Sequence, residues 1–528
     1  MHKFSSLGFY KIFNFYILII TLSCSTIETK KVEFDPPNIL FVISDDQSFP
    51  HAGAYGTHWV RTPSFDKVAN EGLLFFQAFT PNAKCAPSRA CILTGRNSWE
   101  LEEAANHVPF FPEKFKTFPE VLRENGYWVG RTGKGWAPGV AIKKGKSREL
   151  IGKDYNAYKL EPVTTGISNK DYADNFREFL EEKPKGQPFF FWFGAHEPHR
   201  SYEFQSGINK AGKRLEDIPE VPPFWPDNDT VRTDMLDYAL EIEHFDMQLG
   251  KMLTLLQQRG LLENTIVVVT SDNGMPFPRV KGQTFEYDNH LPLAIRWGKG
   301  IKNPGREVHE YVNFIDFAPT FLELAGIQKE NSGMQPLSGQ GLSSLFRDSI
   351  SKNQREFVLI GKERHDVGRP HDLGYPVRGI VKGNYTYMVN FKPNLWPAGN
   401  PETGYLNTDG SPTKTVILND RRTTGSSYYW DLCFGKRNEE ELYNIKKDPF
   451  CMSNLITDST LAKLKTELRF ILFRELEKQG DPRVLGNGDI FDNYKYADEN
   501  TRGFYERYMN GEKLKAGWVN EEDFEKRD

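Results

Sequence analysis

The residues from Cys85 to Arg89, Cys-Ala-Pro-Ser-Arg, could form a reactive centre at the start of a helix. Cys85 follows a loop, and Pro87 suits the first turn of a helix that continues through the apolar residues 90–93. A helix N-terminus offers unpaired N–H groups and the positive end of the helix dipole, which favour an anion. Arg89 lies one turn further on and can reach the same place. A cysteine packed as a small hydrophobe is the alternative, but this setting favours a reaction centre for an anionic group.

Four predicted strands end in polar residues. The apolar runs 38–43, 127–130, 189–193 and 265–270 predict buried strands, and helices between them indicate a mainly parallel α/β sheet covered on both faces. The residues that follow these strands are Asp45 and Asp46, Lys134, His196, and Asp272 with Asn273. Each alone could be a turn residue, a helix cap or a solvated side chain. Ligands bind beyond the carboxyl ends of parallel strands, so together these strand ends predict one functional site.

Four of these residues, Asp45, Asp46, Asp272 and Asn273, offer only oxygen ligands. Such a set selects a hard divalent cation, Ca²⁺ or Mg²⁺. The sequence has no Cys/His quartet of the kind that binds structural zinc.

The stretch Cys85-Ala86-Pro87-Ser88-Arg89 resembles the Cys-x-Pro-Ser-Arg signature of the type I sulfatases, and Leu93-Thr94-Gly95-Arg96 is similar to the family's continuation. The resemblance covers most of the chain, from about residue 37 to residue 455, and implies an alkaline-phosphatase-like fold. It also implies that a maturation enzyme oxidises Cys85 to formylglycine (3-oxoalanine). The implied metal is Ca²⁺ rather than Mg²⁺, bound by the four oxygen ligands and the modified Cys85.

The mechanism implied by this resemblance is covalent. The aldehyde made from Cys85 is hydrated to a geminal diol, one hydroxyl attacks sulfur, and the sugar oxygen leaves. The second hydroxyl is then deprotonated, which expels sulfate and regenerates the aldehyde. Charge accumulates on the sulfate oxygens, so cations must surround them: Lys134 and Lys281 are the expected clamps. Arg89 steadies the diol, and His196 is the candidate general acid. A solvated loop lysine is the alternative reading of Lys281.

One position departs from the family pattern. Many sulfatases have a histidine two residues after the lysine that matches Lys134, whereas here Trp136 stands there. The base for the second step is therefore open between Asp45, Asp46 and a water molecule.

Three further segments are similar to heparan N-sulfatase (sulfamidase) and its bacterial relatives: residues 196–200, 271–278 and 375–378. The expected partner is therefore a sulfated oligo- or polysaccharide, such as an algal glycan or a glycosaminoglycan, with O- or N-sulfate left open. A cationic run in the second domain could recognise uronate or further sulfates, or could be a solvated loop. The candidate substrate-binding residues are His199, Arg200, Arg364, His365, Arg369, His371 and Arg378. Arg200 is a weaker candidate, as are His51 and Trp396.

Length and net charge indicate the number of domains and the kind of partner. A chain of 528 residues predicts more than one domain, and a smaller α+β domain with an antiparallel sheet is expected after the catalytic one. The expected division is a linker at 24–37, a catalytic domain at 38–355, an α+β domain at 356–480 and a tail at 481–528. The formal net charge of −4 gives no general attraction for nucleic acid.

The N-terminus predicts export. Basic residues precede a short apolar run, which is typical of a signal peptide over residues 1–23. The residues before Cys24 resemble a bacterial lipobox, so either a lipid anchor on Cys24 or simple secretion is expected, in the periplasm or at the outer-membrane or cell surface. Cys433 and Cys451 could pair in an oxidising compartment or remain free.

Two other functions stay open. A phosphodiesterase or phosphonate hydrolase of the same superfamily would use the same scaffold, usually with a richer Asp/His metal set. A non-catalytic glycan-binding lipoprotein would keep the cleft but would not need Cys85, Pro87 and Arg89.

Overall fold

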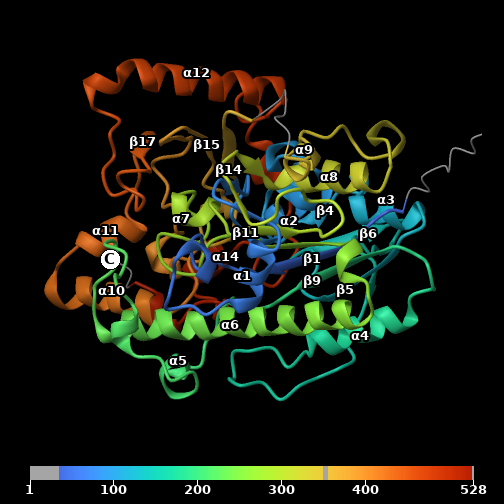
Figure 1. Cartoon of the computed structure of the whole chain (residues 1–528). Helices are drawn as coiled ribbons and strands as arrows, with labels where there is room; N and C mark the ends of the chain where they lie inside the picture. Colours follow the sequence, from blue (N-terminus) through green and yellow to red (C-terminus); the bar gives the residue numbers. More distant parts are fainter. Residues whose placement is uncertain (1–34, 349–354, 526–528) are drawn as a thin grey trace, which may run out of the picture. The chain divides into compact units, whose positions relative to one another are not determined.

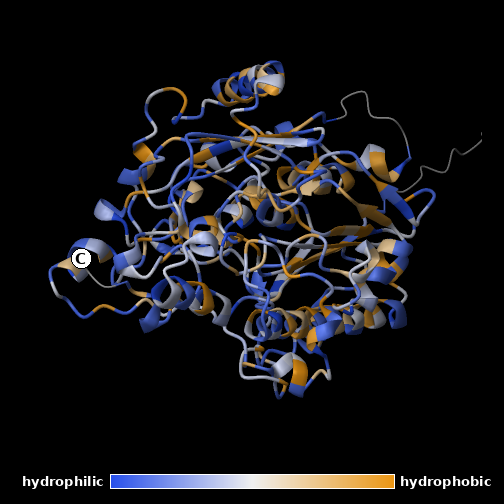
Figure 2. Ribbon diagram, turned by 90° about the vertical axis from the view of Figure 1, so that its left-hand side faces the viewer, coloured by the Kyte–Doolittle hydropathy of each residue, from blue (hydrophilic) through white to orange (hydrophobic). Residues whose placement is uncertain are grey.

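Runs of β-branched and aromatic residues form the strands at the centre of the protein, where hydrophobic residues concentrate (Figure 2). The computed structural model describes residues 35–348 and 355–525. The largest sheet has eight strands in the order β12-β2-β11-β10-β1-β9-β5-β8. In chain order these are β1 (Asn38–Ser44), β2 (Leu73–Phe75), β5 (Trp128–Gly133), β8 (Lys153–Asp154), β9 (Phe189–Gly194), β10 (Thr265–Ser271), β11 (Leu293–Arg296) and β12 (Arg306–Val308). The four predicted strands are confirmed as β1, β5, β9 and β10.

Strand β1 lies at the middle of this sheet and is buried along its whole length. It pairs in parallel with β10 on one side and with β9 on the other, and β9 pairs in parallel with β5. Strand β11 runs antiparallel to β10 and to β2. The sheet is therefore mainly parallel, and the carboxyl ends of β1, β5, β9 and β10 lie along one edge.

Helices cover both faces of the sheet (Figure 1). One face packs against α1 (Pro63–Asn70), α4 (Tyr172–Glu182) and α6 (Asp229–Gln258), and the other against α2 (Cys85–Thr94), α3 (Phe118–Glu124) and α8 (Phe317–Leu324). The periodicity of residues 234–259 predicts a helix, and α6 begins five residues earlier because the Asn228 side chain accepts a hydrogen bond from the Val231 N–H.

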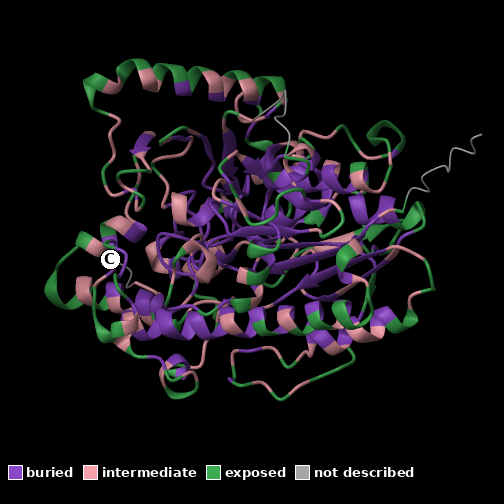
Figure 3. Ribbon diagram, in the orientation of Figure 1, coloured by how far each residue is buried: buried purple, intermediate pink, exposed green. Residues whose placement is uncertain are grey.

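A second sheet follows in the chain. It is antiparallel and consists of β14 (Val358–Lys362), β15 (Val377–Lys382), β16 (Tyr385–Asn390) and β17 (Glu440–Asn444). Helix α12 (Ala462–Lys478) packs on it through Leu468, Leu472 and Leu476, while its outer side stays exposed (Figure 3). This confirms the expected antiparallel sheet of the C-terminal part.

Two helices that the sequence reading did not anticipate, α10 (Pro412–Thr424) and α11 (Tyr428–Phe434), lie between β16 and β17. Helix α10 packs against α6 of the first sheet's helical layer. The connection between these strands therefore returns to the catalytic region, which brings residues near position 409 to the edge where β1 ends.

The remaining strands and α-helices of the described chain are short. They are β3 (Ala78–Phe79), β4 (Phe110–Phe111), β6 (Val140–Lys143), β7 (Lys146–Ser147), β13 (Val312–Asn313), α5 (Ser206–Asn209), α7 (Glu286–Asn289), α9 (Ser343–Phe346), α13 (Ile490–Asn493) and α14 (Phe504–Met509).

Two further expectations concern the N-terminal segment and the cysteines. The signal segment and Cys24 lie outside the described residues. Cys433 and Cys451 are both buried free thiols, so they are not joined to each other. Among residues 35–348 and 355–525, no helix has the length and apolarity needed to cross a bilayer.

Candidate active site

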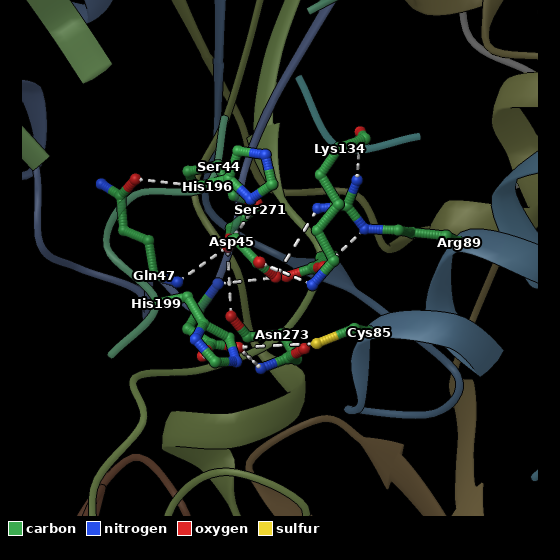
Figure 4. Close-up of polar contacts among 12 residues, drawn as sticks. Ser44, Asp45, Gln47, Cys85, Arg89, Lys134, His196, His199, Ser271 and Asn273 are labelled. Atoms are coloured by element: carbon green, nitrogen blue, oxygen red, sulfur yellow. Dashed lines mark hydrogen bonds and ion pairs between the residues drawn. The ribbon is translucent and has the colours of Figure 1, made fainter. Parts of the chain in front are cut away.

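The carboxyl ends of the central strands meet at one point, as expected (Figure 4). Asp45 follows β1, and its N–H donates to the carbonyl oxygen of Glu197, which follows β9, at 2.9 Å. The N–H of Asp46 donates to Oδ1 of Asp272, which follows β10, at 3.1 Å. One backbone–backbone hydrogen bond and one from a backbone N–H to a carboxylate thus fix the loops after three strands to one another, and their side chains face a common centre.

Cys85 is the first residue of α2 and points to this centre. Its Sγ lies 4.0 Å from Oδ1 of Asp46, and the residue is 1% exposed. Burial, followed by the charge of Asp45, raises the pKa of the thiol, so the unmodified side chain is not a thiolate at neutral pH. The position therefore suits a modified cysteine better than a thiolate nucleophile.

Three cationic side chains bind the carboxylates at this centre. The Arg89 Nε donates to Asp272 at 2.7 Å, while its Nη1 donates to the carbonyl oxygens of residues 134 and 135. Lys134 Nζ lies 2.6 Å from Asp45, and Lys281 Nζ lies 2.6 Å from Asp46. Lys134 and Lys281 are thus positioned beside Cys85 where a substrate anion would arrive.

The carboxylates form a group that fits a divalent cation. One oxygen each from Asp45, Asp46 and Asp272 lies within 4.8 Å of the others, and all three residues are buried. Oδ1 of Asp45 and Oδ1 of Asn273 are buried and accept no hydrogen bond in the described structure. Burial and the neighbouring Asp45 raise the pKa of Asp272 to about 7. The oxygen ligands and these two unsatisfied acceptor atoms together fit Ca²⁺ or Mg²⁺, although the Asn273 amide must turn, because its Nδ2 now donates to Asp46.

Two histidines lie at the rim of this centre. His196 Nε2 lies 3.4 Å from Lys170 Nζ, and because an ammonium can only donate, this nitrogen accepts. Burial and then Lys170 lower the pKa of His196 to about 4, so its ring is neutral at pH 7. His199 Nδ1 lies 2.6 Å from the carbonyl oxygen of Arg200, which leaves Nε2 facing Asp46 at 3.8 Å.

Trp136 supports the nucleophile helix. Its indole Nε1 donates to the carbonyl oxygen of Ala86 at 3.0 Å, and its ring packs edge-on against Phe111. Indole nitrogen is a donor only. The side chain at this position therefore holds the first turn of α2 in place and cannot act as a base.

Sequence reasoning missed three residues of the site. Asp409 holds Lys281 from its far side at 2.8 Å, Lys170 contacts His196, and Lys84, next to Cys85, pairs with the buried Asp366 at 3.0 Å. Asp409 stands in a stretch that is typical of a turn, and Lys170 stands in a long loop. Neither has a local signal, because each reaches the site only through tertiary folding.

The structure does not gather the cations of the second sheet region into one glycan-binding surface, which corrects that expectation. Arg378 is fully buried between Glu363 and Asp481, and His371 is exposed beside Glu506. The remaining candidates contact other parts of the protein. Arg364 donates to the carbonyl oxygens of Asp492 and Tyr494, and Arg369 donates to those of Trp396 and Pro397. His365 contacts Asn82, Arg200 pairs with Asp234, and His51 contacts Tyr238. The guanidinium groups thus bind other groups of the protein, whereas His199 faces Asp46, one of the carboxylates of the site.

Comparison with known proteins agrees with this geometry. Residues 37–327, more than half of the chain, match the family model described as Sulfatase. The chain belongs to the sulfatase family. As a sulfatase it is a sulfuric ester hydrolase, and its fold is the alkaline-phosphatase-like fold.

Relatives span most of the sulfatase chain. Human N-sulphoglucosamine sulphohydrolase is 27% identical over 494 residues, which covers 87% of this chain and 93% of the relative. An ulvan-active sulfatase of Formosa agariphila is 25% identical over 556 residues, with 91% and 84% covered. A structure solved in complex with D-glucosamine-2-N,6-O-disulfate aligns with a TM-score of 0.60 at 21% identity and covers 84% of this chain and 98% of that one. At that identity, the structural likeness supports the fold.

Proposed function

We propose that the protein is an exported sulfatase that removes sulfate from sugars of a sulfated polysaccharide, with formylglycine at position 85 and Ca²⁺ as its metal. The observation that supports this most is the position of Cys85. It begins α2, faces three buried carboxylates and lies among the cations Arg89, Lys134 and Lys281. An anionic ester bound there would meet positive charge on several sides, which is what stabilisation of a sulfuryl transition state requires.

The proposed metal site uses residues whose present partners are replaceable. Asp45, Asp46, Asp272 and Asn273 would hold the cation, and the orphaned oxygens of Asp45 and Asn273 are the atoms that it would satisfy. When bound, Ca²⁺ would neutralise and polarise the sulfate oxygens as a Lewis acid. Lys134 and Lys281, which now neutralise Asp45 and Asp46, would then be free to bind sulfate.

Each remaining residue has a role in this proposal that follows from its contacts. Arg89 is anchored by Asp272 and by two carbonyl oxygens, so it holds α2 against the residues that follow β5 and β10. His196 would give a proton to the departing sugar oxygen. Its ring is neutral in the free protein, and a bound anion would favour the protonated form that this step needs.

The substrate class rests on the relatives. One is named for N-sulphoglucosamine and another for ulvan, so both a glycosaminoglycan and an algal glycan are consistent with the chain. Either N-sulfamate or O-sulfate hydrolysis is compatible with the contacts of Cys85 and the lysines. The proposal is therefore a polysaccharide sulfatase, with the sulfate position left to experiment.

Phosphonate monoester hydrolysis is the second candidate, because the phosphonate monoester hydrolase of Agrobacterium radiobacter aligns with a TM-score of 0.57 at 16% identity. Against it, the described metal ligands are three carboxylates and one amide. A non-catalytic glycan-binding role would not account for the retention of Cys85 opposite these ligands. Export, with a lipid anchor at Cys24 or simple secretion to the periplasm or cell surface, is proposed from the N-terminal sequence alone.

The test is sulfate release from a panel of defined sulfated oligosaccharides and polysaccharides, with a phosphonate monoester and a phosphodiester beside them. Sulfate release that exceeds phosphorus-ester turnover, and that is lost in Cys85→Ala, is expected. Greater turnover of the phosphorus esters would favour the second candidate. Binding of a sulfated glycan without any turnover would favour the non-catalytic role.

A further inference from the structure

Two lysines without an ion-pair partner stand at the rim of the active site. Lys159 and Lys170 face each other across an antiparallel bridge in the loop between β8 and α4. No salt bridge joins either ammonium to a carboxylate in the part of the chain that the structure describes. Nearby Asp154 is bound to Arg131 instead, and Glu197 is bound to Tyr172.

This loop is fixed to the active site. The N–H of Ser168 donates to Oε1 of Glu197 at 2.8 Å, and Glu197 stands directly after His196. Lys170 Nζ then reaches His196 Nε2 at 3.4 Å. Lys170 is half-buried, whereas Lys159 is exposed. The position of Lys170 beside the catalytic histidine is therefore set by the fold and is not that of a free surface side chain.

Lys159 and Lys170 are paired across the bridge, and burial together with the charge of Lys159 lowers the pKa of Lys170. A site that takes one anion beside Cys85 gains nothing from a second cationic pair unless the ligand carries a second anion. An anion bound between the two ammonium groups would relieve their repulsion and form charge-assisted hydrogen bonds with them.

We propose that Lys170, assisted by Lys159, binds a second anionic substituent of the substrate, a sulfate or a carboxylate, next to the sulfate that is removed. The inference rests on the proposed sulfatase function and makes the enzyme selective for sugars that carry two anionic groups close together. Lys170 is then a specificity-determining residue, and the sulfate hydrolysed is the one that lies beyond it, at Cys85.

The test compares substrates that differ by one anion. D-Glucosamine-2-N,6-O-disulfate is compared with the two monosulfated glucosamines, and a uronate-containing sulfated glycan is compared with its carboxyl-reduced form. Sulfate release is measured for the native sequence and for Lys170→Gln, Lys159→Gln and Lys185→Gln. Lys185 is the matched control, because it is an exposed lysine at the opposite end of β9 from His196.

The expected result is a preference in kcat/KM for the two-anion member of at least one pair, which Lys170→Gln reduces about tenfold and Lys159→Gln reduces less. Lys185→Gln should keep the full preference. The pair that shows the preference identifies the second anion as sulfate or carboxylate. No preference in the native sequence, or an unchanged preference in Lys170→Gln, would overturn the inference.

A binding measurement separates this inference from the proposed function. Calorimetric titration of D-glucosamine-2-N,6-O-disulfate and of the uronate-containing glycan uses the Cys85→Ala variant with and without Lys170→Gln, and so needs no turnover. Weaker binding of either probe on loss of Lys170 supports the second-anion site even if no sulfate is released by the native protein. Equal binding of both probes by the two variants contradicts it, whatever the enzyme hydrolyses.

Discussion

The ammonium group of Lys281 lies between two carboxylates, 2.8 Å from Asp409 and 2.6 Å from Asp46. Asp46 belongs to the loop after the central strand, whereas Asp409 precedes α10 and comes from the connection between β16 and β17. The C-terminal region therefore supplies the group that positions a lysine of the candidate active site.

Replacement of Asp409 by Asn should impair catalysis more than folding. Without this carboxylate, Lys281 pairs with Asp46 alone and is drawn toward the metal ligands and away from sulfate. Charge-assisted hydrogen bonds contribute about 1.5–3 kcal/mol, so a fall in kcat/KM of roughly tenfold to a hundredfold is expected. Steady-state kinetics on the substrate found by the panel measures it.

The control for Asp409 is Asp431→Asn, an exposed carboxylate on α11. It should leave kcat/KM within about twofold, because exposed charges contribute little. Unchanged kinetics in Asp409→Asn would mean that Asp409 does not position Lys281.

Removal of the metal should abolish activity and lower stability. Three buried carboxylates lie within 4.8 Å of one another and repel. Arg89, Lys134 and Lys281 offset part of this repulsion, and a bound metal would offset more of it. Treatment with chelator is therefore expected to reduce both sulfate release and Tm, and Ca²⁺ is expected to restore both better than Mg²⁺, because the set offers several oxygen ligands. Thermal unfolding and activity of the same samples give the two readouts. Indifference to chelator would reject the assigned ligands.

Arg378 should contribute to the stability of the fold and not to substrate binding. Its guanidinium is 1% exposed and donates to both Asp481 and Glu363. Arg378→Met would leave the buried carboxylate of Asp481 without a cationic partner, whereas Glu363 would keep Arg483. The expected cost is about 3–5 kcal/mol in the free energy of unfolding. Urea unfolding measures this loss, and KM of the folded fraction should not change.

The matched variant is Arg474→Met, which removes an exposed arginine paired with Glu475. This substitution should lower the free energy of unfolding by less than about 1 kcal/mol. A raised KM with native stability in Arg378→Met would restore Arg378 as a glycan-binding residue.

The buried carboxyl of Glu241 predicts a pH dependence of stability. Burial and the neighbouring Glu197 raise its pKa to about 9, so the folded protein holds a proton that the unfolded chain releases above about pH 4.5. The contribution of this group to the free energy of unfolding is fully present below about pH 4.5 and is lost as the pH rises toward 9. Glu241→Gln should therefore be more stable than the native sequence at pH 8, by on the order of 2–4 kcal/mol, and equal to it near pH 4. Chemical unfolding across this range checks it; a variant that is equally or less stable at pH 8 contradicts the assignment.

The sequence was sufficient to predict the central strands and the site residues that follow them. Continuous apolar runs such as 265–270 have few structures open to them, and parallel strands bring their carboxyl ends together whatever the loops do. The sequence alone therefore predicts that Asp45 and Asp272 lie in one site. Cys85 was placed by its motif and by the proline that starts its helix.

Other residues could not be placed from the sequence, because long-range pairing determines what they do. Arg378 stands in a segment similar to a sulfatase family, yet its charge is neutralised by Asp481, 103 residues away. Asp409 and Lys170 reach the site from a long connection and a loop, and their local sequences contain no sign of it. Charge alone thus misassigned the buried arginines, and local sequence overlooked Asp409, Lys170 and Lys84 at the site.

The central claim is that residue 85 is the modified reaction centre. Its most direct test is mass spectrometry of the peptide that contains residue 85, from protein produced in its native cell and active in sulfate release. The account predicts formylglycine, as the aldehyde or its hydrate, at that position. An active protein in which this peptide carries only unmodified cysteine would contradict it.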